Sequence, residues 1–313
     1  MTQDFPKHIQ QLQEEILKLK AKDDIFLMAH YYQRPEIQAI ADVLGDSLGL
    51  SRIAQKEAKS DTIIFAGVNF MAETASILNP KKTVYIPDVR ATCPMARMCS
   101  AATVIATKNE YNLPVVLYVN TLAEAKAHAD IMCTSANAVK VCQSLNSKSI
   151  IFGPDWNLGW HVNWRTGLDI IPVPEHGYCY VHDKFTVADF QTLKEKYPAA
   201  KITVHPECRP EVQQLADHVG STSGIKNFIK NSEASDFIIG TEQGLEFVLR
   251  KETEGQKGLH FARSDGICRT MKLHTLEKIR RILLKHPKEN IIKVPEHIAK
   301  AARKGIQRML AIS

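Results

Sequence analysis

A threefold repeat is the feature that most constrains how this 313-residue chain can fold. Each copy starts with a strand-like segment that ends in polar residues and continues through a Ser-containing turn into a helix. A second strand-like segment then runs into glycine, and a short strand, a loop and a cysteine complete the copy. Equivalent landmarks lie 86 to 89 residues apart, and they are Ser47, Ser135 and Ser221; Gly67, Gly153 and Gly240; and Cys93, Cys179 and Cys268. This period is too long for a solenoid repeat, so we predict three homologous α/β units.

Eight short segments rich in β-branched residues are typical of buried parallel strands. They occupy residues 24–32, 62–68, 83–88, 115–121, 149–155, 169–174, 201–207 and 236–242. Helical patterns lie between them, at residues 121–129, 185–197 and 209–219. Because strands and helices alternate, we predict three similar three-layer α/β/α domains with parallel sheets. Their predicted bounds are 1–106, 107–192 and 193–285, with residues 286–313 packing on the first domain.

Composition and charge narrow the class of protein. Apolar residues make up 44% of the chain and charged residues 24%, as in ordinary soluble globular proteins. Apolar runs are too short to span a membrane, and residues 1–24 read as an amphipathic surface helix, not a signal peptide. Seven widely spaced cysteines fit a disulfide framework poorly, so we predict a cytoplasmic protein with reduced thiols.

The excess of basic over acidic residues is modest, which argues against nucleic acid as a partner. The net charge is +6, aromatic residues make up only 7% of the chain, and the sequence contains no RNA- or DNA-binding signature. A mildly positive protein attracts small anionic substrates equally well. We therefore expect small anions as partners, with neither nucleic acid nor membrane among them.

Polar residues follow the first strand of each copy in an i, i+2 pattern. In open parallel sheets, ligands bind at the carboxyl ends of the strands. Residues two apart on a strand point to the same face. The pairs are His30 and Tyr32, Tyr118 and Asn120, and His205 and Glu207. Such groups can serve in general acid and base catalysis, so we expect them to face a shared active site.

Three cysteines share one phase of the repeat, whereas Cys99, Cys133, Cys142 and Cys208 do not. A single cysteine is usually a buried structural residue. Three thiolates from three repeats instead favour zinc or an iron–sulfur cluster with one open coordination position, which is typical of catalysis. Spacing alone leaves zinc and iron open. It also leaves open a zinc-dependent lyase or aldolase and a non-catalytic iron–sulfur redox sensor.

The motifs together resemble the quinolinate synthase family. The resemblance runs from about residue 25 to residue 285 and rests on an ordered set of segments: "MAHYYQRPEIQAIADVLGDSLGLS", "GVNFMAETA", "ATCPMA", "YVNT", "CTSANA", "PDWNLG", "GYCYVHDKF", "HPEC", "GSTSG", "GTEQGL" and "CRTMKLHTL".

The resemblance implies a transferase of de novo NAD biosynthesis, also called pyridine nucleotide biosynthesis. Members of the family condense iminoaspartate (iminosuccinate) with dihydroxyacetone phosphate and release phosphate and water as quinolinate forms. Their three α/β domains have pseudo-threefold symmetry around a central active site. A functional link to the L-aspartate oxidase that supplies iminoaspartate is implied as well.

The resemblance also implies roles for individual residues. One 4Fe–4S cluster per chain would be held by Cys93, Cys179 and Cys268, with the open iron acting as a Lewis acid. Cys99 is interpreted as a bystander thiol. The implied catalytic residues are Tyr32, His205 and Glu207. The implied substrate-binding residues are His30, Ser47, Met71, Tyr118, Val119, Asn120, Ser135, His182, His205, Pro206, Glu207, Ser221, Thr222 and Met271.

Overall fold

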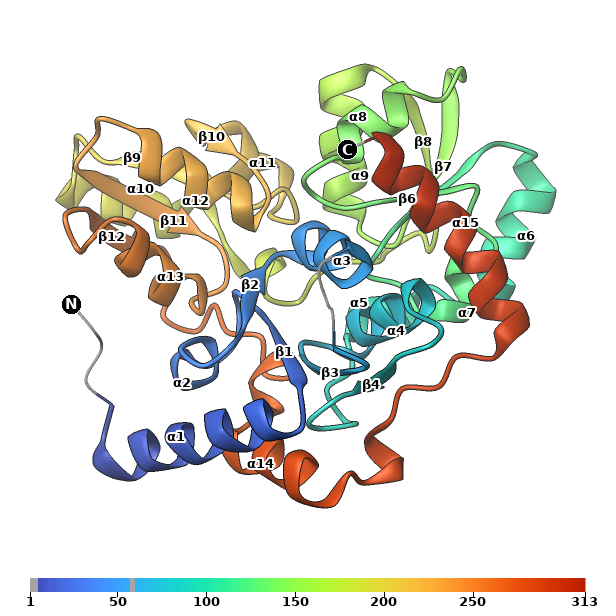
Figure 1. Cartoon of the computed structure of the whole chain (residues 1–313). Coiled ribbons are helices and arrows are strands. Elements are labelled where there is room, and N and C mark those ends of the chain that lie inside the picture. Colours follow the sequence, from blue (N-terminus) through green and yellow to red (C-terminus); the bar gives the residue numbers. More distant parts are fainter. Residues whose placement is uncertain (1–4, 57–59, 313) are drawn as a thin grey trace. The chain divides into compact units, whose positions relative to one another are not determined.

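The computed structural model describes residues 5–56 and 60–312, and in these residues the chain forms three four-stranded parallel sheets (Figure 1). The first sheet has the strand order β2-β1-β3-β4, the second β6-β5-β7-β8 and the third β10-β9-β11-β12. In each sheet the first strand of the repeat therefore lies between the second and the third. This identical order confirms the prediction of three similar α/β units with parallel sheets.

The strands are short, as buried strands of α/β proteins usually are. Their bounds are β1 (Ile25–His30), β2 (Val43–Gly45), β3 (Thr62–Ala66), β4 (Thr83–Tyr85), β5 (Val115–Tyr118), β6 (Ile131–Cys133), β7 (Ser149–Gly153), β8 (Asp169–Pro172), β9 (Lys201–Val204), β10 (His218–Val219), β11 (Asp236–Gly240) and β12 (Gly258–Phe261).

Helices and 3-10 turns connect these strands. The α-helices are α1 (Lys7–Lys22), α2 (Pro35–Gln38), α3 (Ser47–Lys56), α4 (Asn69–Leu78), α5 (Pro94–Met98), α6 (Ala101–Tyr111), α7 (Ala123–Lys126), α8 (Ala138–Gln143), α9 (Trp156–Thr166), α10 (Val187–Lys196), α11 (Pro210–Gln214), α12 (Thr222–Asn231), α13 (Leu245–Glu252), α14 (Leu276–Lys285) and α15 (Glu296–Ile312). The 3-10 turns are η1 (His182–Lys184), η2 (Met271–Leu273) and η3 (Lys288–Asn290). No helix in the described parts of the chain combines the length and the apolarity that a membrane crossing needs.

All eight predicted strands are present, and the strands that the sequence missed are sheet edges. These are β2, β6 and β10, which have two or three residues each, whereas β12 is the short strand expected before Cys268. A segment this short cannot display a hydrophobic period, so only pairing with the neighbouring strand reveals it. The helix predicted over 209–219 was partly wrong for this reason: α11 ends at Gln214, and β10 follows. The helix predicted over 121–129 is likewise reduced to α7.

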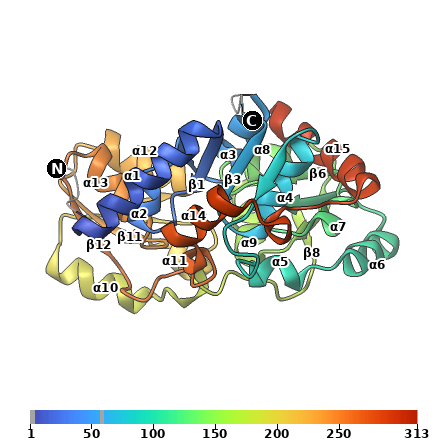
Figure 2. The same ribbon diagram turned by 60° about the horizontal axis from the view of Figure 1, so that its bottom comes forward.

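The chain divides into two compact bodies. We call the first the one-sheet body, drawn from residues 1–93 and 268–299, and the second the two-sheet body, drawn from residues 94–267 and 300–313. In the one-sheet body, α1 and α14 lie side by side and bury Ile16 and Ile279 against Leu27 and Ile64 of the sheet (Figures 1 and 2).

The C-terminal segment contributes to both bodies. Within the one-sheet body, the amide of Ile292 donates to the carbonyl of Val84 at the sheet edge. Within the two-sheet body, Gly305 of α15 lies against Met132, and Arg308 donates to the carbonyl of Asp130. The domain bounds given above and the packing of residues 286–313 on the first domain stay predictions.

His274 ties the segment after Cys268 to the strand-end loop of β3. Its Nε2 lies 2.6 Å from the carbonyl oxygen of Gly67, and the side chain is fully buried. The other ring nitrogen, Nδ1, is buried and has no hydrogen-bond partner among the described residues. Burial therefore lowers the pKa of His274 to about 4, although the hydrogen bond to Gly67 opposes the shift.

This lowered pKa makes His274 a source of acid sensitivity. Because the folded pKa lies below the ordinary value of 6.5, unfolding takes up a proton, and stability is lost as the pH falls from about 6.5 to about 4. Between pH 7 and pH 5 we expect a loss of about 2 kcal/mol from this group. His274→Gln, which keeps an N–H for Gly67, should reduce that loss, and chemical denaturation at both pH values measures it.

The exposed His297 provides the matched control. His297→Gln should leave the acid-induced loss of stability unchanged. If the His274→Gln and His297→Gln variants lose stability equally between pH 7 and pH 5, the buried imidazole does not cause the effect.

Candidate active site

Two strand ends form the same turn. After β1, the amide of Tyr32 donates to Nδ1 of His30 over 3.1 Å, and after β9 the amide of Glu207 donates to Nδ1 of His205 over 3.2 Å. Since Nδ1 accepts a hydrogen bond in both rings, the proton of the neutral imidazole lies on Nε2. In both histidines the N–H donor is therefore Nε2.

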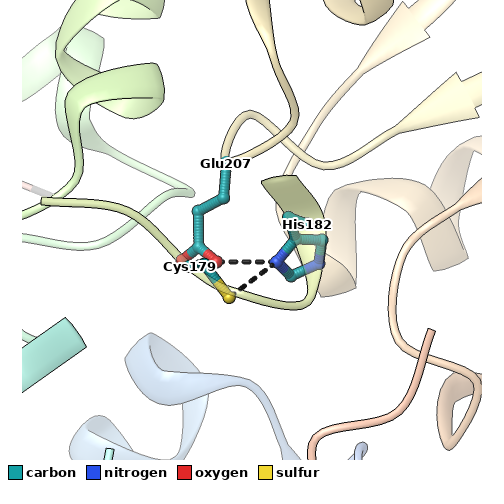
Figure 3. Close-up of side chains that lie close together, drawn as sticks. All are labelled: Cys179, His182 and Glu207. Atoms are coloured by element: carbon teal, nitrogen blue, oxygen red, sulfur yellow. Dashed lines mark hydrogen bonds and ion pairs between the residues drawn. The ribbon is translucent and has the colours of Figure 1, made fainter. Parts of the chain in front are cut away.

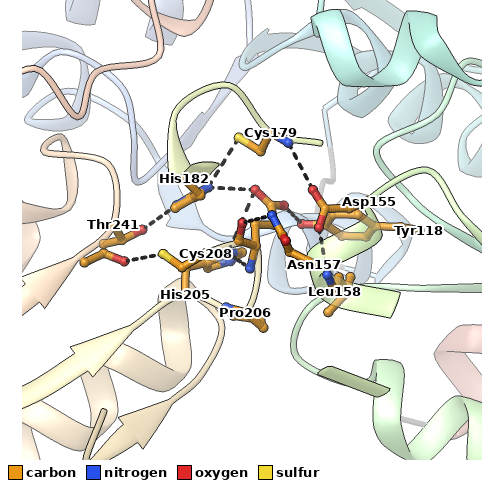
Figure 4. A network of polar contacts seen from close by, with 12 residues as sticks. Tyr118, Asp155, Asn157, Leu158, Cys179, His182, His205, Pro206, Cys208 and Thr241 are labelled. Atoms are coloured by element: carbon orange, nitrogen blue, oxygen red, sulfur yellow. Dashed lines mark hydrogen bonds and ion pairs between the residues drawn. The ribbon is translucent and has the colours of Figure 1, made fainter. Parts of the chain in front are cut away.

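Glu207 is the centre of a buried hydrogen-bond network in the two-sheet body (Figures 3 and 4). The hydroxyl of Tyr118, at the end of β5, donates to Oε1 over 2.7 Å. Nδ1 of His182 lies 2.7 Å from Oε2, and Nδ2 of Asn157 donates to the backbone carbonyl of Glu207 over 3.0 Å. Glu207 is only 3% exposed, so Tyr118 and His182 replace water around its carboxylate.

His182 links this network to the segment that carries Cys179. Its Nε2 lies 3.0 Å from the hydroxyl of Thr241, and its ring stacks on His205 with centroids 4.4 Å apart. Nδ1, which faces Glu207, is also 3.3 Å from Sγ of Cys179 (Figure 3). The predicted residues Tyr118, Cys179, His182, His205 and Glu207 are therefore brought together within one body.

Two buried carboxyl groups in this region have opposite charge preferences. Burial alone would raise the pKa of Glu207, but the neighbouring imidazoles of His205 and His182, with hydrogen bonds from His182 and Tyr118, hold it below its ordinary value. Asp155 lies nearby, and burial together with the charge of Glu207 raises its pKa well above the ordinary value. Burial and the charge of Glu207 likewise raise the pKa of Tyr118. Glu207 is thus kept as a hydrogen-bond acceptor beside a phenol that keeps its proton.

Asp155 is a buried residue of this region that sequence reasoning missed. It is 1% exposed, and its side chain caps α9 by accepting from the amide of Leu158 over 2.7 Å. Its second oxygen accepts from the amide of Cys179 over 3.0 Å. Asp155 follows Gly153 by two residues, as Asn69 follows Gly67 and Glu242 follows Gly240, so the repeat contained a signal for it.

The one-sheet body shows a related arrangement around the strand end of β1. Gln33 donates to the carbonyl of Met271 over 2.8 Å, and Lys272 donates in return to the carbonyl of Tyr32. The rings of His30 and Tyr32 meet edge to face with centroids 4.5 Å apart. The turn after β1 is thus bound to the segment after Cys268, just as the turn after β9 is bound to the segment after Cys179.

The remaining predicted residues lie at helix starts or in strand-end loops. Ser221 caps α12 by accepting from the amide of Gly224 over 3.2 Å, and Thr222 begins that helix. Ser47 is the first residue of α3, and the side chain of Ser135 hydrogen-bonds to Tyr118. Four further residues lie in these loops or at the start of α4 and η2: Met71, Val119, Asn120 and Met271.

Exposure separates the seven cysteines into two groups. Four are at most 1% exposed, and these are Cys99, Cys133, Cys142 and Cys208. Burial raises the pKa of Cys99 and Cys142 to about 12 and raises that of Cys133 and Cys208 well above its ordinary value. The other three, Cys93, Cys179 and Cys268, are partly exposed. The three thiols in repeat phase are therefore the ones that burial does not exclude from serving as ligands.

The structure does not test the convergence of these three thiols. Cys179 belongs to the two-sheet body, and Cys93 and Cys268 belong to the one-sheet body. Each thiol precedes a short helical turn, α5, η1 or η2. Their meeting at one metal centre, and the role of each predicted site residue, stay predictions.

Comparison with known proteins identifies close relatives. The family model described as Quinolinate synthetase A protein matches residues 14–311. The chain is 50% identical to the quinolinate synthase of Methanothermobacter thermautotrophicus, over 97% of this chain and 99% of the relative. It is also 50% identical to that of Pyrococcus abyssi and 49% identical to that of Methanoregula boonei, over 96% of this chain in both cases and over 99% and 98% of the relatives.

The double contact of Asp155 yields a stability prediction. Asp155→Ala removes a helix cap and the acceptor for the amide of Cys179, and we expect it to lower the free energy of unfolding by about 2 kcal/mol. Ser100, which caps the exposed start of α6, is the matched control, because Ser100→Ala removes a cap alone and should cost about 1 kcal/mol. Denaturant titration compares the two, and equal losses would show that the Cys179 contact contributes nothing.

Proposed function

Because the chain belongs to the Quinolinate synthetase A protein family, we propose that it forms quinolinate from iminoaspartate and dihydroxyacetone phosphate in de novo NAD biosynthesis. The observation that carries the proposal is the buried network in which Tyr118 and His182 hold Glu207 beside Cys179. Carbon–carbon bond formation, imine formation and dehydration all require protons to move at fixed positions. A transferase of this kind needs such groups at the strand ends, where they lie.

The chemistry of the cysteines supports a 4Fe–4S cluster. Cys93, Cys179 and Cys268 would hold it, since they are the partly exposed thiols, whereas the other four are buried and strongly disfavour the thiolate form. When bound, such a cluster supplies a Lewis-acidic iron that stabilises negative charge on an oxygen leaving the substrate. Asp155 contributes by fixing the amide of Cys179 and hence the course of the chain at this ligand.

Glu207 is the residue best placed to take up and return a proton. Its Oε1 accepts from the Tyr118 hydroxyl and its Oε2 faces His182, so a proton accepted by Glu207 has two neighbouring groups that can exchange it. His205 directs Nε2–H away from the turn and can donate to a substrate oxygen. In the one-sheet body, His30 and Tyr32 present the same pairing of imidazole and proton donor.

Uncharged groups are proposed to bind the anionic substrates. The starts of the ten-residue helices α3 and α12, at Ser47 and at Ser221 with Thr222, offer backbone N–H groups to a carboxylate or phosphate. Asn120 has a buried Oδ1 without a hydrogen-bond partner among the described residues, which suits it to accept from a substrate N–H. Binding through dipoles avoids burying additional cationic side chains.

A zinc enzyme is the second candidate, because donor atoms of Cys179, His182 and Glu207 all lie within 4.8 Å of one another. Thiolate, imidazole and carboxylate are ligands that zinc accepts. However, His182 already uses Nδ1 for Glu207 and Nε2 for Thr241, and Glu207 uses Oε1 for Tyr118. Zinc binding would break contacts that the structure makes, so the iron–sulfur proposal is favoured.

The cellular location of the protein and the source of iminoaspartate follow from this chemistry. Seven free thiols and an oxygen-sensitive cluster require a reducing compartment, so we place the protein in the cytoplasm. Iminoaspartate is an unstable imine that must come from an oxidation of aspartate, and an L-aspartate oxidase is the proposed source.

The cluster assignment predicts a shared loss of metal and activity. Anaerobically purified protein should contain about four irons and four sulfides per chain, whereas the zinc alternative requires one zinc. Cys93→Ala, Cys179→Ala and Cys268→Ala should each abolish cluster absorbance and quinolinate formation together. Cys142→Ala, which removes a buried thiol on α8, should keep both, and full activity in any of the three ligand variants would refute the assignment.

The role of Glu207 predicts a defect in turnover. Glu207→Gln cannot accept a proton, so kcat for quinolinate formation should fall by about 10²–10⁴-fold while the iron content stays at the wild-type level. Glu175→Gln is the matched control because the side chain of Glu175 is 82% exposed. A Glu207→Gln enzyme with the kcat of the control would exclude Glu207 from proton transfer.

A further inference from the structure

Each repeat contains one buried donor side chain at the same position. Gln38 ends α2, Lys126 ends α7, and Gln213 is the penultimate residue of α11. Successive members are 88 and 87 residues apart, and their exposed fractions are 2%, 0% and 0%. Burying an amide or an ammonium group costs free energy unless the group is hydrogen-bonded, so each of these three side chains is expected to make a hydrogen bond.

The two glutamines make the same pair of contacts. Nε2 of Gln38 donates to the carbonyls of Tyr31 and Gln33 over 2.9 and 2.8 Å. Nε2 of Gln213 donates to the carbonyls of Pro206 and Cys208 over 2.8 Å each. In both repeats the accepting carbonyls lie seven and five residues before the glutamine. They flank Tyr32 in the first repeat and Glu207 in the third.

Lys126 occupies the repeat position of the two glutamines and has an ammonium group in place of their amide. Its Nζ donates to the carbonyl of Thr121 over 2.6 Å, again five residues earlier in the chain. The turn that it contacts follows Tyr118, the last residue of β5, and carries Asn120. A fully buried lysine at the end of a four-residue helix has no evident role in the core, but it can satisfy a carbonyl that strand pairing leaves unpaired.

We infer that Gln38, Lys126 and Gln213 are positioning residues that fix the three strand-end turns carrying the proposed substrate-binding and proton-transfer groups. The catalytic and binding roles of those groups rest on the proposed function, whereas the hydrogen bonds that hold the turns are independent of it. The amides of Tyr31, Val119 and His205 still donate to residues of the neighbouring strands, and the residues after them leave the sheet. A donor from the helix that follows replaces the missing sheet partner and holds the turn.

The consequence for Glu207 is direct. Gln213 fixes the backbone on both sides of Glu207, and Asn157 donates to the backbone carbonyl of Glu207. The second turn, held by Lys126, directly follows Tyr118, whose hydroxyl donates to Glu207. Catalytic groups lose much of their effect when they are displaced by about 1 Å, so loosening either turn should lower turnover more than it lowers stability.

The chain itself suggests the matched variants, because the side chain that donates to the turn is glutamine in two repeats and lysine in the third. Lys126→Met removes the donor and keeps the length and apolar volume of the side chain. Lys126→Gln keeps a donor and introduces the residue type of the other two repeats. Lys148→Met, at an exposed position before β7, controls for the loss of a lysine.

Two measurements test the inference. Relative to wild type, Lys126→Met should lower kcat for quinolinate formation at least about tenfold and accelerate amide hydrogen exchange in residues 118–122 at least about tenfold. Lys126→Gln should restore both to within about threefold of wild type, and Lys148→Met should change neither. A side chain with a merely structural role would lower the unfolding midpoint without this recovery by glutamine.

The inference is overturned if Lys126→Met matches Lys148→Met in kcat and in exchange, or if Lys126→Gln is as impaired as Lys126→Met. Should Lys126→Met fail to fold, the same comparison is made in the third repeat. There Gln213→Met removes the donor and Gln213→Lys keeps one, with exchange followed in residues 205–209.

This design separates the inference from the proposed function. If wild-type protein forms no quinolinate, the proposed function fails, but hydrogen exchange still reports whether Lys126 and Gln213 hold their turns. If wild-type protein forms quinolinate and the donor-removing variants are unaffected, the proposed function stands and the positioning role fails.

Discussion

The hydrogen bonds to the carboxylate of Glu207 are the interactions on which the candidate site depends. A buried carboxylate is tolerated only when donors replace its water, and here the donors come from two different segments. Tyr118 approaches from the end of β5, and His182 approaches from the segment after Cys179. The carboxylate of Glu207 therefore holds together the ends of β5 and β9 and the segment after Cys179, all within the two-sheet body.

The repeats use one backbone design for different chemistry. Turns with an imidazole that accepts from the amide two residues later follow both β1 and β9, and a short helix with a buried donor comes after each of them. The side chains on these turns differ: Tyr32 occupies the position that Glu207 occupies in the third repeat. A repeated scaffold thus presents a phenol in one copy and a carboxylate in another.

Much of the fold and part of the site could be predicted from the sequence. The eight buried strands were recognisable because β-branched residues cluster there. Tyr118, His205 and Glu207, which the structure brings together in one network, were predicted as site residues because ligands bind at the strand ends of parallel sheets. Asp155 and Lys126 were not found, since a lone acid after a glycine or a lone lysine in a helix normally lies in solvent. Their burial became apparent only when neighbouring segments covered them.

The sequence by itself determined the threefold α/β repeat, the strand-end polar pairs and the phase of Cys93, Cys179 and Cys268, because all of these are periodic along the chain. Only the tertiary structure decided which partners the polar groups meet. The contact between Tyr118 and Glu207 joins residues from different sheets, and the opposite directions in which the pKa values of Glu207 and Asp155 are shifted depend on burial and on nearby charge. Long-range contacts of this kind leave no local pattern in the order of the residues.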